Sequence, residues 1–495
     1  MVKTKVYFIL LAATALLIGR LATLQIFEWR YYRQIADENR IKLDKIPADR
    51  GIFYDRNGEI LVRNNPDGRE YIFGEAMSQL LGFVGEASET ELDKWQLKDI
   101  VGKMGLEQQY DERLRGKDGS ELFEKDTLGQ KIREIGRREP SSGENLTLTV
   151  DSGLQREAYK ILKQRRGAVV ASDPTSGEIL ALVSSPGFKP DKLEKYLTDK
   201  DLPFLNRAVS GEYPPGSVFK IITAAAALEE GRVSEQTLIE DTGVIKVGDY
   251  SYSNWYFTQY GRKEGKINLT RALARSNDIF FYKLGEELGM AALADWAKYF
   301  GAGAKTKIDL PGEASGLMPD PAWKKIFLGE SWYLGDTYIA AIGQGNILMT
   351  PLQVNQMTGI IAGNGKNCRP HLVKPEILNP KSETEWCQKL DIQESTIKLI
   401  KEGMKQVAET GGTAWPFFDF MVKGQKVSVA GKTGTAEFGS DLKSAQAKTH
   451  AWFTGFVPAE EPKIVVTVLL EAAGEGSYQA APVAKELLQY WLERQ

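Results

Sequence analysis

The sequence has very few residues that bind metals or form covalent crosslinks. Its 495 residues include only two cysteines, Cys368 and Cys387, and two histidines, His371 and His450. Their spacing matches no pattern of zinc ligands, so we expect neither a metal site nor a cofactor. Outside the cytoplasm the two cysteines could form one disulfide, or they could remain buried thiols, and the sequence does not decide between these states.

The sequence also lacks an excess of either charge, and it contains no internal repeat. Its 63 lysines and arginines are balanced by 66 aspartates and glutamates, which leaves a net charge of -3. Proteins that bind nucleic acids usually present a basic face, so this balance argues against that class. A hydrophobic content of 42% and a charged content of 26% are typical of globular protein, and the length predicts more than one domain.

Charged residues are almost absent from one N-terminal stretch, Val6 to Phe27, which contains only Arg20. A helix of this length spans about 30 Å of hydrocarbon. Because Lys3 and Lys5 precede it, we expect an uncleaved anchor with a cytoplasmic N-terminus and the rest of the chain outside the cytoplasm. A cleaved signal peptide is the alternative, because Ala13-Thr14-Ala15 resembles a cleavage site. We expect the Arg20 side chain to reach the outer interface rather than a partner in the membrane.

The residues after this stretch predict a small domain of mixed structure. Residues 46–64 alternate apolar and polar side chains around Asn57-Gly58, which is a strong signal for a β-hairpin. Residues 86–139 are rich in charge, and their pattern predicts mostly helix. The composition of residues 137–145 indicates a linker. We therefore expect an anchor at residues 1–27 and a small β/α domain at residues 28–145.

A different pattern begins at residue 146. Strand-like runs occupy residues 146–150 and 167–185, helical patterns follow, and strand-like runs return near the C-terminal end at residues 426–438, 449–458 and 463–471. Strands at both ends of a region that encloses helices predict one antiparallel sheet flanked by helices. We therefore expect an α+β domain at residues 146–495, ending in an amphipathic helix.

The stretch EYPPGSVFK contains the first candidate for chemistry. Pro214 and Pro215 do not fit a helix interior, so a helix should begin near Gly216. Ser217 and Lys220 then share one face of that helix. The apolar run that follows predicts burial, which lowers the pKa of a lysine amine. A neutral amine can act as the base of a hydroxyl nucleophile, and the positive end of a helix favours an oxyanion.

Ser-x-x-Lys arises easily by chance, and Ser395 to Lys398 form a second copy on a charged helix, which we interpret as a solvated face. Two further elements favour the first copy. Ser276-Asn277-Asp278 stands where a helix begins, and Lys432-Thr433-Gly434 lies in a strand. Taken singly, these two elements could be helix caps and a strand bulge. In this order, the three elements match the motifs of penicillin-binding proteins and class A β-lactamases.

On these motifs the chain resembles a class B penicillin-binding protein, a D,D-transpeptidase of peptidoglycan synthesis with a penicillin-binding/β-lactamase-like fold. The resemblance extends to RGIFYDRNGEILVRN, LLGFVG, LTLTVDSGLQ and GDTYIAAIGQGNILMTPLQ, and so to nearly the whole chain. The last of these stretches, together with Asp278, is more similar to the elongation-type penicillin-binding protein 2 than to the division type.

The resemblance implies a catalytic role for residues of all three motifs. Ser217 would be the acylated nucleophile and Lys220 its general base. Ser276 would relay protons near the leaving group, and Lys432 would maintain the electrostatic field. Asp278 occupies the place where many relatives have asparagine, and an ionised carboxylate only accepts hydrogen bonds. A donor role toward the substrate is therefore in doubt at this position.

The resemblance also implies how the substrate is bound. Thr433 and Thr435 would bind the terminal carboxylate of the donor peptide, which would add to the strand through Gly434. The backbone N–H groups of Ser217 and Thr435 would form the oxyanion hole. The implied partners are stem peptides ending in D-Ala-D-Ala, the cytoplasmic membrane as a single-pass protein, and a SEDS-type glycosyltransferase, with no nucleic acid.

Two other activities are compatible with these motifs. One is a related hydrolase, either a D,D-carboxypeptidase or a β-lactamase, although no clear deacylating Glu loop is present. The other is a weakly catalytic β-lactam sensor, or a scaffold that activates a glycosyltransferase. The chain departs from the family in the short stretch between Asn64 and Leu81, which indicates a shortened pedestal and makes scaffold contacts doubtful. Residues 248–261 are rich in aromatics, and we favour loop packing over a wall of the cleft.

Overall fold

The structure is a computed structural model, and it describes residues 2–66, 68–91, 93–126, 128–374, 386–439 and 448–495. The chain forms two compact units. The small unit contains residues 1–51 and 112–144, and the large unit contains residues 52–111 and 145–495. Residues 52–111 therefore belong to the same compact unit as the predicted C-terminal domain. The predicted boundaries at residues 27 and 145 stay predictions.

The small unit begins with the apolar helix. Helix α1 (Val2–Ala22) continues through one π-helical turn (Thr23–Phe27), and in the part of the chain that the structure describes this is the one helix long and apolar enough to cross a membrane. Helix α2 (Trp29–Arg40) follows. The three-stranded sheet of the unit has the order β1-β7-β8, with strands β1 (Ile41–Ile46), β7 (Gly119–Lys125) and β8 (Lys131–Arg138).

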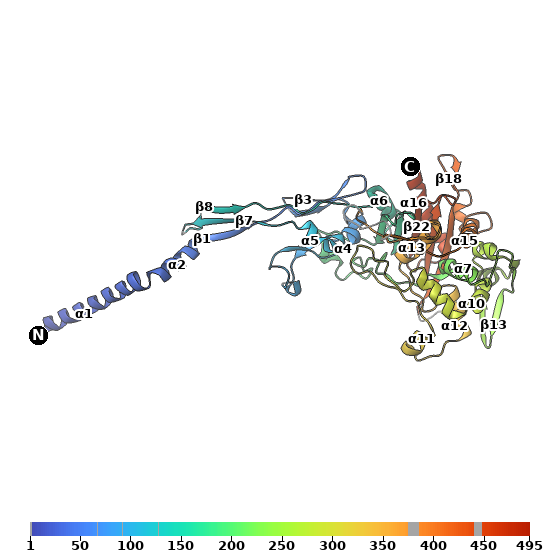
Figure 1. The fold of residues 1–495 in the computed structure, drawn as a ribbon, viewed down its shortest axis with the longest axis horizontal. Helices are drawn as coiled ribbons and strands as arrows, with labels where there is room; N and C mark the ends of the chain where they lie inside the picture. Colours follow the sequence, from blue (N-terminus) through green and yellow to red (C-terminus); the bar gives the residue numbers. More distant parts are fainter. Residues whose placement is uncertain (1, 67, 92, 127, 375–385, 440–447) are drawn as a thin grey trace. The chain divides into compact units, whose positions relative to one another are not determined.

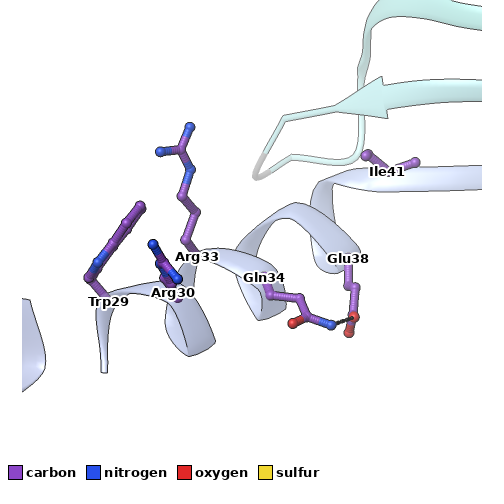
Figure 2. A pocket seen from close by; sticks show the side chains of 6 residues that line it. All are labelled: Trp29, Arg30, Arg33, Gln34, Glu38 and Ile41. Carbon is purple, nitrogen blue, oxygen red and sulfur yellow. Dashed lines mark hydrogen bonds between the residues drawn. The ribbon is translucent and has the colours of Figure 1, made fainter. Parts of the chain in front are cut away.

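A shallow hollow of about 580 Å³ lies beside α2, and Figure 2 shows its side chains. The guanidinium groups of Arg30 and Arg33 lie 5.8 and 5.6 Å from the centre of the Trp29 ring. Gln34 donates a hydrogen bond of 2.9 Å to Glu38. This hollow contains no nucleophile, so it is not the candidate site.

The prediction of mostly helix over residues 86–139 is wrong. The described residues of this region form the strands β6 (Ile100–Gly102), β7 and β8, and their helical segments are short: a 3-10 turn (Glu89–Glu91), α4 (Gly105–Gln109) and α5 (Asp111–Leu114). The spacing of opposite charges imitated a helix face, but the charges instead pair across strands. Glu124 lies directly opposite Arg133, with 3.5 Å between their charged atoms. Such cross-strand pairs stabilise a sheet in the way that i,i+4 pairs stabilise a helix.

The large unit begins with the predicted hairpin, which is confirmed. Strands β2 (Phe53–Tyr54) and β3 (Ile60–Asn65) are antiparallel, and Gly58 lies between them with φ +87°. Strands β4 (Gly68–Tyr71) and β9 (Leu146–Thr147) complete this sheet in the order β4-β3-β2-β9. The hairpin therefore pairs with the first residues of the predicted C-terminal domain.

The main sheet of the large unit has five strands in the order β11-β10-β22-β21-β20. All neighbouring strands are antiparallel, which confirms the predicted antiparallel sheet. Strand β20 lies at the edge. The strands are β10 (Gly167–Ser172), β11 (Ile179–Ser185), β20 (Ala430–Phe438), β21 (Lys448–Val457) and β22 (Ile464–Leu470).

Helices cover both faces of this sheet, and Figure 1 shows β22 with α16 and α13. Side chains alternate between the faces along each strand. On β21, Phe453 packs with α6 (Ser152–Leu162) and α16 (Gly476–Glu493) on one face, whereas Trp452 packs with the helices of the other face. The helices of that other face are α7 (Lys220–Glu229), α9 (Leu269–Arg275), α10 (Asp278–Tyr299), α12 (Leu334–Ala341), α13 (Pro351–Ala362) and α15 (Glu394–Val407).

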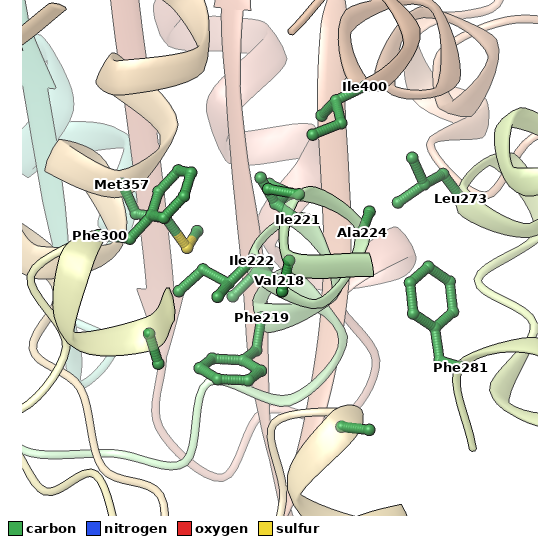
Figure 3. Packing of buried hydrophobic residues seen from close by; sticks show 14 of the residues in the cluster. Val218, Phe219, Ile221, Ile222, Ala224, Leu273, Phe281, Phe300, Met357 and Ile400 are labelled. Atoms are coloured by element: carbon green, nitrogen blue, oxygen red, sulfur yellow. The ribbon is translucent and has the colours of Figure 1, made fainter. Parts of the chain in front are cut away.

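Helix α7 lies in the middle of the helices that cover this second face of the sheet. Figure 3 shows Ile221 and Ile222 of α7 among buried side chains that include Phe281 and Ile400. The predicted apolar surroundings of Lys220 are thus confirmed. Outside this core, Cys368 and Cys387 form a disulfide between the paired strands β16 (Lys366–Cys368) and β17 (Cys387–Lys389), a pairing that the sequence left open.

Candidate active site

The first motif lies at the turn that begins α7. Gly216 to Phe219 form one 3-10 turn that leads directly into the helix, so the predicted start near Gly216 is confirmed. Gly216 has φ +57°, a conformation that glycine adopts without strain. Its N–H donates to the carbonyl of Gly343 at 2.8 Å, and the Trp452 indole donates to the carbonyl of Pro214 at 3.0 Å. These two bonds hold the turn that carries the half-buried Ser217.

Lys220 is completely buried, and its amine contacts the second motif. Its Nζ donates to the Ser276 carbonyl at 2.9 Å, to Ser276 Oγ at 3.3 Å and to Asp278 Oδ1 at 2.5 Å. Burial lowers the pKa of the Lys220 ammonium, and the nearby Asp278 carboxylate opposes part of this shift. Burial therefore favours the neutral form of the amine, whereas Asp278 favours the charged form.

The Ser217 hydroxyl makes no hydrogen bond with any residue that the structure describes. The three contacts of Lys220 use all three donors of a charged amine. A base must instead offer a lone pair, which the amine gains only when it loses a proton. The direct bond between Ser217 and Lys220 that the spacing suggested is therefore absent from this arrangement, and the assignment of Lys220 as the base stays a prediction.

Lys432 reaches the same hydroxyl from the sheet. Its Nζ donates to Ser276 Oγ at 2.8 Å and to the Thr433 carbonyl at 3.0 Å. Burial lowers the pKa of Lys432 well below its ordinary value, the charge of Lys220 lowers it further, and Asp278 opposes the shift. Two buried lysines thus converge on one serine oxygen, and a proton could pass between them through that hydroxyl.

The turn that carries the second motif joins helices α9 and α10, and hydrogen bonds fix its conformation. Ser276 ends α9 in a left-handed conformation with φ +52°. Asn277 caps α10 by accepting the Phe280 N–H, and its amide donates to the buried carboxylate of Asp241 at 2.9 Å. Nothing in the sequence pointed to Asp241, because it lies far from the motif along the chain.

The third motif occupies the edge strand β20, two of whose threonines have partners that the sequence did not reveal. Thr433 Oγ1 lies 2.7 Å from Thr413 Oγ1, and the N–H of Gly476 donates to Thr435 Oγ1 at 3.4 Å. Gln344, a residue outside the sheet, donates to the Thr435 carbonyl at 3.2 Å. The N–H and C=O of a strand residue point to the same side, so the Thr435 N–H is directed there too, as an oxyanion hole requires.

Gly434 allows this strand to approach the nucleophile turn closely. A Cβ atom at this position would lie 3.0 Å from the Trp452 side chain, 3.1 Å from the Val218 side chain and 3.2 Å from the Pro215 carbonyl. The interpretation of this glycine as a point of close backbone approach is therefore confirmed.

The other sequence features lie outside this cluster. Ser395 and Lys398 are exposed on α15, in agreement with a solvated helix face. Residues 248–261 form strand β14 (Tyr250–Ser253) and helix α8 (Trp255–Tyr260), and the Trp255 indole donates to the carbonyl of Arg275, next to the second motif. Within the residues that the structure describes, no group of three or more acidic, histidine or cysteine side chains could hold a metal ion.

Comparisons with known proteins agree with this geometry. The model of the penicillin-binding protein transpeptidase domain matches residues 167–489, and that of the penicillin-binding protein dimerisation domain matches residues 67–148. The peptidoglycan D,D-transpeptidase MrdA of Acinetobacter baumannii is 30% identical, over 96% of this chain and 85% of the relative.

Two solved structures are similar along almost their whole length. The complex of penicillin-binding protein 2 with MreC from Helicobacter pylori has a TM-score of 0.79 and 29% identity, over 92% of this chain and 99% of that chain. The second is a structure of a peptidoglycan synthase complex that describes the coordination of polymerization and crosslinking. It has a TM-score of 0.78 and 28% identity, over 99% of this chain and 98% of that chain. The chain therefore belongs to the class B penicillin-binding proteins, in the elongation-type penicillin-binding protein 2 group of serine D,D-transpeptidases.

Proposed function

We propose that this chain crosslinks the stem peptides of peptidoglycan during cell-wall elongation, with Ser217 as the nucleophile. The observation that supports this proposal is the convergence of Lys220 and Lys432 on Ser276 Oγ, at 3.3 and 2.8 Å. These residues come from three motifs far apart in the sequence. Two buried amines with lowered pKa values beside one hydroxyl are what proton transfer near neutral pH requires.

In the proposed acylation step, Ser217 Oγ attacks the carbonyl of the penultimate D-Ala, and its proton passes to the neutral amine of Lys220. Ser276 Oγ gives its proton to the nitrogen of the last D-Ala and takes the proton that Lys220 gained. The C–N bond breaks, and the last residue leaves as free D-Ala. The N–H groups of Ser217 and Thr435 stabilise the oxyanion, while Thr433 and Thr435 bind the carboxylate of the leaving residue.

In the second step, the amine of a neighbouring stem attacks the resulting ester. A C–N bond forms, the bond between the acyl carbon and Ser217 Oγ breaks, and the amine proton returns to that oxygen through Ser276 and Lys220. Splitting the transfer into two steps is the benefit of a covalent nucleophile. β-Lactams should acylate the same serine.

The location and the partners follow from the N-terminal helix and the family. We propose that Val2–Phe27 spans the cytoplasmic membrane once, with the bulk of the chain on the extracytoplasmic side. Trp29 and Arg30 follow directly and would lie at the outer interface, where aromatic and basic side chains are common. The polymerising partner would be a SEDS-type glycosyltransferase.

Fluorescent penicillin tests the proposal. We expect stable labelling of the full-length protein, complete loss of label in Ser217→Ala, and unchanged labelling in Ser395→Ala, which removes the other Ser-x-x-Lys serine. Thermal unfolding of both variants should match that of the native protein, because neither hydroxyl is a buried hydrogen-bonded group. Rapid release of the drug would indicate a hydrolase, and absence of label in the native protein would indicate a scaffold. Loss of label in folded Ser395→Ala would contradict our choice of nucleophile.

A further inference from the structure

An open groove of about 630 Å³ lies between α16 and the short 3-10 turn Trp415–Phe417. This volume is typical of a ligand-binding groove. Its lining combines apolar surface with charges of both signs, from Trp415, Pro416, Asp419, Pro482, Lys485 and Gln489. None of these residues belongs to the three motifs.

Trp415, which lines this groove, forms an exposed aromatic pair with Tyr478. The ring centres of Trp415 and Tyr478 are 5.5 Å apart, and the two residues are 46% and 60% exposed. Large aromatic side chains contribute strongly to binding because they present a wide apolar surface at low entropic cost. Two of them side by side in the open, with their ring planes tilted by 56°, indicate a surface that a ligand covers.

The aromatic pair is close along the chain to residues that contact the two threonines of β20. Thr413, whose hydroxyl contacts Thr433, stands two residues before Trp415. Gly476, whose N–H contacts Thr435, stands two residues before Tyr478. Two residues of extended chain span at most about 7 Å. The aromatic pair therefore begins within one or two residue lengths of the two threonines that are proposed to hold the leaving D-Ala.

The second half-reaction suggests what this surface binds. An amine that attacks the ester must approach from where the D-Ala nitrogen departed, because both steps share one tetrahedral geometry and one proton relay. The rest of that attacking molecule must then continue beyond Thr433 and Thr435. The surface that it meets there is the aromatic pair and the groove.

We propose that this groove binds the acceptor, that is, the stem peptide whose amine attacks the acyl-enzyme. This inference rests on the proposed transpeptidase function. A stem peptide carries an ammonium and carboxylates on a chain with apolar methyl groups. The groove offers Asp419 and Glu486 to the ammonium, Lys485 to a carboxylate, and apolar surface from Pro416 and Pro482. Stacking on Trp415 and Tyr478 would hold the peptide while its amine reaches the ester carbon.

The test compares two acceptors with one donor, using the full-length protein in detergent. The donor is a thioester analogue of an acyl-D-Ala peptide. The acceptors are free D-alanine, which is too small to reach the groove, and a disaccharide-tetrapeptide isolated from the wall of the organism that carries the gene. In the Trp415→Ala/Tyr478→Ala variant, we expect the KM of the disaccharide-tetrapeptide to rise about 10-fold, as for loss of a binding hot spot. The kcat of that reaction, transfer to D-alanine, and acylation by fluorescent penicillin should change less than about 2-fold.

Further variants separate binding in the groove from general damage. Trp415→Phe keeps a ring and should restore most of the affinity. Lys485→Glu leaves the aromatic pair intact and should change the KM of the disaccharide-tetrapeptide alone. Phe327→Ala removes an aromatic that is 70% exposed on helix α11 (Pro321–Phe327), and it should have no effect.

An unchanged KM for the disaccharide-tetrapeptide in the double variant would overturn the inference. Equal losses with both acceptors would overturn it too, because they would show damage to the catalytic centre rather than to a distant binding surface. Failure of the native protein to be acylated by penicillin would instead contradict the proposed function itself.

Discussion

At the scale of single residues, the main feature of the active site is that two lysine amines are buried close together. Lys220 and Lys432 are both fully buried, and both donate to Ser276 Oγ. Two charged amines so close together repel one another, and burial penalises each of them. The only carboxylate bonded to either amine, among the residues described, is Asp278, so the site favours one positive charge at a time. A pair of this kind leaves one amine free to accept a proton.

Replacing Asp278 with asparagine should change the pH dependence of acylation. The carboxylate opposes the lowering of the Lys220 pKa, so its removal should lower that pKa further. The neutral amine is the form that accepts the Ser217 proton, and it is populated above the pKa. The acid limb of the rate profile should therefore move to lower pH in Asp278→Asn. Rates of acylation by fluorescent penicillin, measured from about pH 5 to about pH 10, would reveal this shift.

Asp295→Asn is the matched control, because it removes the same charge from an exposed position on the same helix. Its profile should superimpose on that of the native protein. A second carboxylate, Glu437, has a pKa raised by burial and by Asp278, so its titration should also move to lower pH in Asp278→Asn. An acid limb that stays in place or moves to higher pH would show that Lys220 is not the titrating base.

The sequence predicted which residues gather here but not how they bond. Spacing and motif order predicted that Ser217, Lys220, Ser276 and Lys432 form one site. The ion pair of Lys220 with Asp278 was not foreseen, since motif spacing does not specify which donors an amine uses. The contacts that Asp241, Thr413 and Gln344 make from positions far away in the sequence left no local signal.

At the scale of elements, the predictions succeeded where apolar periodicity was strong. The main-sheet strands β10, β11 and β22 are buried on both faces, so they appear as mostly apolar runs in the sequence. The strands β7 and β8 lack such runs, because they are rich in charge and are stabilised by pairs across the sheet. Local pattern does not distinguish such pairs from the charged face of a helix.

The turn that carries Ser217 depends on close contact with Gly343, and this contact can be tested by adding one methyl group. Gly343 has φ +74°, and a Cβ atom there would lie 2.3 Å from the Gly216 carbonyl oxygen. Gly343→Ala should therefore displace the nucleophile turn, lower the free energy of unfolding by about 1–3 kcal/mol and slow acylation at least 10-fold. Thermal unfolding and the rate of penicillin labelling measure the two effects.

Gly359→Ala is the matched control for this change. Gly359 lies in helix α13, and a Cβ atom there would meet nothing within 4 Å. Alanine in a helix is favoured over glycine by about 0.5–1 kcal/mol, so this variant should be slightly more stable and equally active. Native rates of labelling in Gly343→Ala would show that the turn does not depend on the contact.

At the scale of the whole molecule, the chain combines an apolar N-terminal helix with a complete transpeptidase fold. The small unit contains that helix and a charged three-stranded sheet, and the large unit contains the main sheet and every motif residue. The match to the dimerisation domain model begins only at residue 67, after the first hairpin.

The last prediction decides between an anchor and a cleaved signal peptide. With one epitope at each end of the chain, both epitopes should stay on a single penicillin-labelled band that remains in the membrane fraction after an alkaline wash. Leu10→Asp/Leu17→Asp places two charges in the apolar helix, each at a cost of about 2.5–3.5 kcal/mol for insertion, and should remove the labelled band from the membrane. Loss of the N-terminal epitope from a labelled band would show cleavage near Ala15. The penicillin label itself should persist in that case, because every residue of the proposed active site lies in the large unit.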